Sequence, residues 1–80
     1  MTRTEIKNSV EDLFKDIFDD DYILVEESTT AENIEEWDSL NHIVLIGSIE
    51  QEFGVKFTLA EMVSMNDVGV MIDLIQSKLS

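Results

Sequence analysis

The sequence predicts an all-α protein: a small bundle of three longer helices and one short helix, with a long ordered loop between the first and second helices. Two stretches, one near each end of the chain, place their apolar residues three or four positions apart, which is the spacing of one helix face. No segment alternates apolar and polar residues well enough to predict a strand. With 80 residues, the chain is expected to form one domain, residues 1–80.

The first helix is predicted over about residues 3–18. Its apolar stripe consists of Ile6, Val10, Leu13, Phe14, Ile17 and Phe18. Thr2 and Glu5 have the spacing of a capping box, in which each side chain accepts a hydrogen bond from the other residue's backbone amide. Three consecutive aspartates at 19–21 are expected to end the helix, because carboxylates at a helix C-terminus oppose the macrodipole.

The stretch from about 19 to 38 is predicted to be a loop whose scattered apolar residues hold it against the helices. Loops of this length in compact domains are usually functional. Trp37, at its end, is interpreted as an apolar plug that fixes the loop beside the next helix, in preference to an exposed recognition residue.

The second helix is predicted over about 39–53, with Asp38 as its cap and Gly54 as its stop. A helical wheel gives this helix two apolar faces. One face holds Leu45, Ile46, Ile49 and Phe53, and the other holds Leu40, Ile43, Val44 and Gly47, with Glu50 in a gap between them. Either the helix is buried on both sides, or the second face is an exposed patch that binds a partner.

Two further helices complete the bundle. Thr58 and Glu61 form a second capping box, which opens a short helix over about 59–64. Asn66 or Ser64 is expected to cap the last helix, about 67–79. Its stripe consists of Val68, Met71, Ile72, Ile75 and Leu79, and Met62, Met65 and Met71 are expected to provide adaptable packing.

Composition excludes several classes of function. The 18 acidic residues outnumber the 5 basic ones, giving a net charge of −13. This charge repels nucleic acids and anionic membrane surfaces, so we expect basic protein partners. The chain has no cysteine, and so no thiol nucleophile of its own.

So short a chain has little room for a deep substrate cleft, and we expect no enzyme activity. The acidic run 16–27 fails the EF-hand pattern, so no metal site is expected. With no signal peptide and no membrane span, we expect a cytoplasmic monomer.

Ser39 is the main candidate for a functional residue, as a site of covalent modification. A hydroxyl at a helix N-terminus lies where free amides and the dipole favour an attached anion, so Ser39 could carry a phosphodiester. It could also be only a cap or first-turn residue. Asp38, Ser39 and His42 include the residue types of a catalytic triad, but one helix turn does not provide an oriented base, and no catalytic residue is predicted. His42, when protonated, could approach the phosphodiester.

The run Asp38-Ser39-Leu40 follows an acidic loop and opens an apolar helix that ends Glu50-Gln51-Glu52-Phe53-Gly54-Val55. In this combination the chain resembles an acyl carrier protein over nearly its whole length. The longer run WDSLNHI looks more like specialised carriers than like the carrier of housekeeping fatty acid synthesis.

The resemblance implies a covalent cofactor and a set of partners. Ser39 would bear 4′-phosphopantetheine, a phosphoprotein linkage made by a phosphopantetheinyl transferase from coenzyme A, and Asp38 would belong to the same motif. Acyl-loading and acyl-transferring enzymes with basic docking surfaces would be the other partners, in fatty acid or polyketide biosynthesis. The residues implied to face partners are Leu40, Ile43, Val44, Gly47 and Glu50, and those implied to line an acyl pocket are Leu45, Ile49 and Phe53.

The resemblance leaves the cargo open. Asn41 and Val44 stand where fatty-acid-synthesis carriers have acidic residues, which affects partner choice. An aminoacyl or peptidyl carrier would have the same modification. A different class of protein, an unmodified acidic helical adaptor that binds a basic groove, would need no modification of Ser39.

Overall fold

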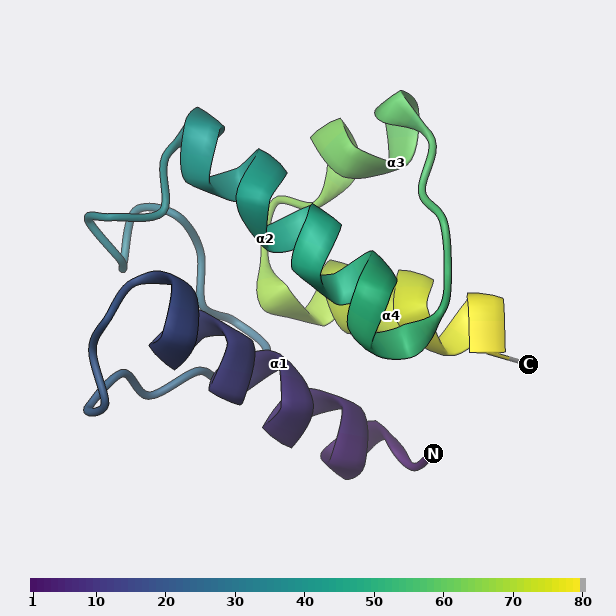
Figure 1. Cartoon of the computed structure of the whole chain (residues 1–80), viewed down its shortest axis with the longest axis horizontal. Coiled ribbons are helices and arrows are strands. Elements are labelled where there is room, and N and C mark those ends of the chain that lie inside the picture. Colours follow the sequence, from purple (N-terminus) through teal and green to yellow (C-terminus); the bar gives the residue numbers. More distant parts are fainter. Residues whose placement is uncertain (80) are drawn as a thin grey trace.

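A computed structural model describes residues 1–79 and has four helices: α1 (Arg3–Ile17), α2 (Ser39–Phe53), α3 (Leu59–Ser64) and α4 (Val68–Leu79) (Figure 1). The all-α prediction is confirmed. Among the described residues the only β-type pairing is an isolated bridge between Thr30 and Asp67. The helix bounds lie within one residue of the predicted ranges, with α1 ending at Ile17 and α4 beginning at Val68.

Helix α1 begins at the predicted capping box. The backbone amide of Glu5 donates to Oγ1 of Thr2 at 3.1 Å, and the amide of Thr2 donates to Oε1 of Glu5 at 2.7 Å. The bond from the Thr2 amide lowers the pKa of the Glu5 carboxyl, because it favours the charged form. Beyond the C-cap Phe18, Asp19 has φ 51°, a left-handed conformation that aspartate tolerates better than most residues.

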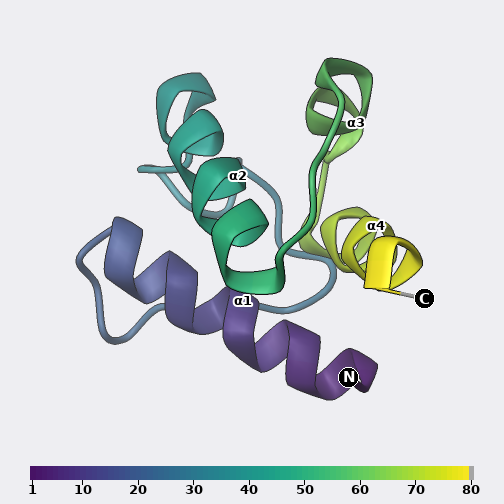
Figure 2. The same cartoon turned by 45° about the vertical axis from the view of Figure 1, so that its right-hand side comes forward.

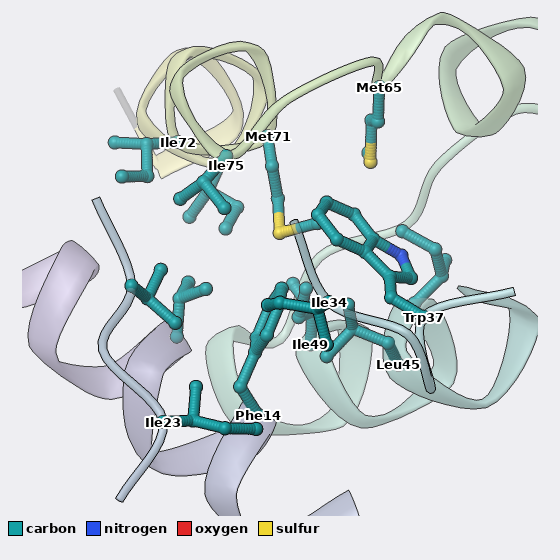
Figure 3. Close-up of a cluster of buried hydrophobic side chains, with 14 of the residues drawn as sticks. Phe14, Ile23, Ile34, Trp37, Leu45, Ile49, Met65, Met71, Ile72 and Ile75 are labelled. Atoms are coloured by element: carbon teal, nitrogen blue, oxygen red, sulfur yellow. The ribbon is translucent and has the colours of Figure 1, made fainter. Parts of the chain in front are cut away.

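The core lies where α1 packs against α2 and α4 (Figures 1 and 2). Its helical members are Ile6, Val10 and Phe14 of α1, Leu45, Ile46 and Ile49 of α2, and Val68, Met71, Ile72 and Ile75 of α4. Figure 3 shows Ile23 and Ile34 of the long loop reaching into the same cluster. Helix α3 contributes no buried residue and lies away from α1 in both views.

The long loop between α1 and α2 is held against the helices by buried side chains at alternate positions and by hydrogen bonds. Ile23 and Val25 are buried, whereas Tyr22 and Leu24 are exposed, so the extended segment turns every second side chain inward. The amide of Val25 donates to the carboxylate of Glu11 in α1 at 2.9 Å. The loop is therefore fixed on α1 before it reaches α2.

The same loop caps α4. The amides of Val68 and Gly69 donate to the carbonyls of Thr29 and Glu27, at 3.0 and 2.7 Å. The side chain of Asp67 accepts from Val70 at 2.8 Å, so Asp67 is the capping residue. The prediction of Asn66 or Ser64 in this role was wrong, because Ser64 instead donates to the carbonyl of Glu61 within α3.

Arg3 joins three parts of the chain. Its guanidinium donates two bonds to Glu27 in the loop, at 2.9 and 2.7 Å, and one bond to Asp73 in α4, at 2.6 Å. This pairing raises the pKa of Arg3 above its usual range and lowers that of Glu27. A bidentate arginine–carboxylate pair has a defined geometry as well as charge, so Arg3 positions the loop relative to both terminal helices.

We predict that Arg3→Gln lowers the melting temperature, because the loop loses its tether to α1 and α4. The matched control is Lys56→Gln, which removes the same charge from an exposed residue outside the ion pairs of the described chain. Thermal denaturation followed by circular dichroism measures the difference. Equal effects of the two substitutions would contradict the tether.

The decrease in melting temperature caused by Arg3→Gln should also depend on pH. A carboxyl whose folded pKa is lowered stabilises the fold above its unfolded pKa, about 4.3 for glutamate. That contribution disappears as the pH falls through the lower folded value. The difference in melting temperature between the wild type and Arg3→Gln should therefore be largest at neutral pH and become smaller below about pH 4.

Candidate functional site

Asp38 and Ser39 have separate roles at the start of α2. The carboxylate of Asp38 accepts from the amide of Asn41 at 2.8 Å, which makes Asp38 the N-cap, as predicted. Ser39 is the first helical residue; its side chain is exposed and has no hydrogen-bond partner among residues 1–79. The structure excludes Ser39 as the cap and places it in the first turn of α2, with an exposed hydroxyl that makes no hydrogen bond within the described chain.

Trp37 fixes the place where α2 begins. Its side chain is only 4% exposed, so the predicted plug is confirmed. Its ring meets Phe14 of α1 edge-on, with centroids 5.1 Å apart. Figure 3 shows the indole between Leu45 of α2 and Met65, which follows α3.

His42 connects the loop and α2 to α3. Its Nδ1 accepts from Nε1 of Trp37 at 3.0 Å, and its Nε2 lies 2.9 Å from the carbonyl oxygen of Met62. Because both ring nitrogens are engaged within the protein, neither is available to a group on Ser39 in this conformation. The expected approach of a protonated His42 to a phosphodiester would require the ring to leave at least one of these two contacts.

An open groove of about 700 Å³ lies between the start of α2 and α3. Ser39, His42 and Ile43 line its α2 side, and Leu59, Met62 and Val63 line its α3 side. Its walls are mainly apolar, and Ser39 belongs to its lining. A group attached to Ser39 would therefore have an apolar surface within reach.

The two predicted faces of α2 are separated as expected. Leu45, Ile46 and Ile49 are buried, and Phe53 packs partly buried against the core. On the other face, Leu40, Ile43, Val44 and Gly47 are exposed, with Leu40 at 70% and Ile43 at 63%. This excludes the alternative in which α2 is buried on both sides.

Glu50 has a structural contact that the sequence did not indicate. Its carboxylate accepts from the amide of Phe57 at 2.8 Å, and its backbone carbonyl accepts from Val55 at 3.1 Å. Glu50 thus holds the turn that leads from α2 to α3. A role in partner binding would use only its remaining exposed surface.

Sequence reasoning missed two residues of the exposed apolar surface. Leu59 and Val63, one turn apart on α3, are 72% and 71% exposed and line the groove opposite Ile43. Their spacing of four is a helical signal, but α3 is too short for a face to be assigned from sequence.

The surface is strongly acidic. Arg3, Lys7, Lys15 and Lys78 are all paired with carboxylates, so most of the positive charge is already neutralised within the fold. In the described part of the chain, no group of three or more histidine and acidic side chains is arranged to hold a metal ion. Nor does any helix there have the length and apolar character needed to cross a membrane.

The chain is thus an acidic four-helix bundle with an exposed serine at the start of its second helix, beside an apolar groove. No family model and no curated protein matches the chain. Among solved structures, the chain is similar to a holo acyl carrier protein from Geobacter metallireducens, determined by solution NMR. The two are 38% identical with a TM-score of 0.86, over 92% of this chain and 85% of that one. The chain belongs to the acyl carrier protein family, whose members are carriers and not catalysts.

We predict that Asp38→Ala destabilises the protein by about 1 kcal/mol, because the amide of Asn41 loses its capping partner. For a domain of this size, that loss lowers the melting temperature by about 4–8 °C. Asp38→Asn retains a capping oxygen and should stay close to the wild type. An equal loss in both variants, measured by thermal denaturation, would show that the cap is not the cause.

Proposed function

We propose that the protein holds acyl groups as thioesters on a 4′-phosphopantetheine arm attached to Ser39 and presents them to partner enzymes. The observation that carries this proposal is the free, exposed Ser39 hydroxyl at the start of α2, in the lining of an apolar groove. The likeness to a holo acyl carrier protein supports it.

The residues around Ser39 fit a phosphodiester. The first amides of a helix have no partner within the helix. At α2 the amide of Asn41 is taken by Asp38, which leaves those of Ser39 and Leu40 to face an attached anion. The positive end of the helix dipole favours negative charge at the same place.

The arm would supply the thiol that this chain lacks, since the sequence has no cysteine. The protein's own contribution would be to bind and orient the arm and to shield its cargo. The apolar groove beside Ser39 suits an apolar acyl group. Leu45 and Ile49 are fully buried and Phe53 is partly buried, so an acyl pocket among these three would open only when core side chains move apart.

Partner enzymes would dock on the exposed apolar face of α2, formed by Leu40, Ile43, Val44 and Gly47. A side chain at Gly47 would point into open space, so this part of the surface is unobstructed. The acidic surface around it would attract enzymes with basic docking surfaces, including the phosphopantetheinyl transferase.

The proposal predicts that Ser39→Ala abolishes modification. The wild type, incubated with a broad-specificity phosphopantetheinyl transferase, coenzyme A and magnesium, should gain the mass of one phosphopantetheinyl group. Ser48→Ala, a serine substitution in the same helix, should gain it as well. If the Ser39→Ala variant gains the group, or if a control carrier is modified while the wild type is not, Ser39 is not the site for this transferase. Gain by the Ser39→Ala variant would place the attachment at another residue, whereas absence of gain in the wild type beside a modified control carrier would favour the unmodified adaptor.

The docking face yields a second prediction. Ile43→Asn should lower kcat/KM of the transferase for this protein by about tenfold, because an apolar contact at the interface is lost. Leu24→Asn is the matched control, since Leu24 is 79% exposed but lies in the loop after α1. Equal kinetics for the two variants, each with an unchanged melting temperature, would argue against docking at this face.

A further inference from the structure

We propose that Trp37, His42 and the carbonyl of Met62 form a latch that is controlled by protonation of His42. With His42 neutral, the latch holds α3 against the start of α2; with His42 protonated, it releases Trp37 and lets the groove beside Ser39 open. The latch is a property of the unmodified chain, and only its consequence for the arm rests on the proposed function.

The two contacts of His42 fix its tautomer. The indole N–H of Trp37 can only donate, so Nδ1 of His42 must accept. The carbonyl of Met62 can only accept, so Nε2 must carry the proton. A neutral imidazole satisfies both contacts. An imidazolium has a proton on each nitrogen, so its Nδ1–H would face the Trp37 N–H across the same 3.0 Å.

Protonation of His42 would remove the hydrogen-bond acceptor of a buried side chain, Trp37. Trp37 is 4% exposed, and His42 is the acceptor for its indole N–H. A buried donor without an acceptor is unfavourable, so protonation of His42 should displace the two rings from each other. Because Nε2–H stays bonded to the Met62 carbonyl, and more strongly when the ring is charged, a ring that moves away from Trp37 moves α3 with it.

Helix α3 is the part of the fold most able to respond. It has no buried residue, and Figure 2 shows it standing apart from α1. Besides the His42 contact, it is tied by the ion pair of Glu61 with Lys78 of α4, at 3.0 Å. Leu59, Met62 and Val63 of α3 form one wall of the groove, so a shift of this helix changes the groove's width.

The other titratable groups near the latch are carboxylates. Histidine is the side chain whose charge ordinarily changes within the physiological pH range. Glu36 and Asp38 flank Trp37 in the chain, and Glu61 precedes Met62 in α3. The pKa of Glu61 is lowered by the Thr58 amide and by Lys78, so this carboxylate stays ionised throughout that range.

The test is a series of nitrogen-15 NMR spectra of the unmodified protein between about pH 8 and pH 5. The Trp37 indole signal and the amides of α3 should shift with the same midpoint as the His42 ring. His42→Gln keeps an acceptor and a donor but does not titrate, so these shifts should disappear while the spectrum stays that of a folded protein.

Trp37→Phe separates the latch from a simple effect of charge. Without the indole N–H, a proton on Nδ1 meets no donor, so His42 should titrate while the α3 amides stay nearly still. Three results would overturn the latch: α3 shifts of undiminished size in Trp37→Phe, no α3 shift in the wild type while the ring titrates, or a ring that never titrates. If the latch is observed but Ser39 cannot be modified, only the proposed function is refuted and the latch stands.

Discussion

The position of Ser39 depends on the burial of Trp37, two residues before it. The indole packs edge-on against Phe14 of α1 and donates to His42 of α2, so a single side chain fixes the end of the loop on both helices. Truncating a buried tryptophan typically costs about 3–5 kcal/mol, a large fraction of the stability of a small domain. The other local contacts at the start of α2 are hydrogen bonds of exposed groups, such as the Asp38 cap and the bond from the Asn41 side chain to the Glu36 carbonyl.

The fold divides into a fixed part and an adjustable part. The helices α1, α2 and α4 share the buried core, and the long loop is bound to them through Arg3, Glu11 and the first amides of α4. Helix α3 has no buried residue; it is held by the partly buried Met62, by its buried C-cap Met65 and by polar contacts of Glu61 and the Met62 carbonyl. This arrangement suits a carrier, which must keep its attachment point in place while the surface near its cargo adapts.

The sequence correctly predicted the features that depend on residues close together in the chain. The stripes of α1 and α4, the capping boxes of Thr2 and Thr58, and the two faces of α2 all arise from residues a few positions apart. The missed features join distant residues: Arg3 reaches Asp73, and His42 reaches Met62 across 20 positions. Loop carbonyls from residues 27 and 29 likewise satisfy the first amides of α4. Neither spacing nor propensity reveals such contacts. The cap of α4 was misassigned for a local reason: Asn66 and Asp67 are adjacent and both are favoured caps, and the helix begins after Asp67, which accepts from Val70.

The central claim is that Ser39 is the residue at which this protein carries its cargo. The most direct measurement is tandem mass spectrometry of the protein purified from its own cells, with fragmentation that localises any phosphopantetheinyl group to one residue. The account predicts that the group, with or without an acyl thioester, is found on Ser39 and on no other serine. Modification at another residue, or an active protein that never carries the group, would contradict it.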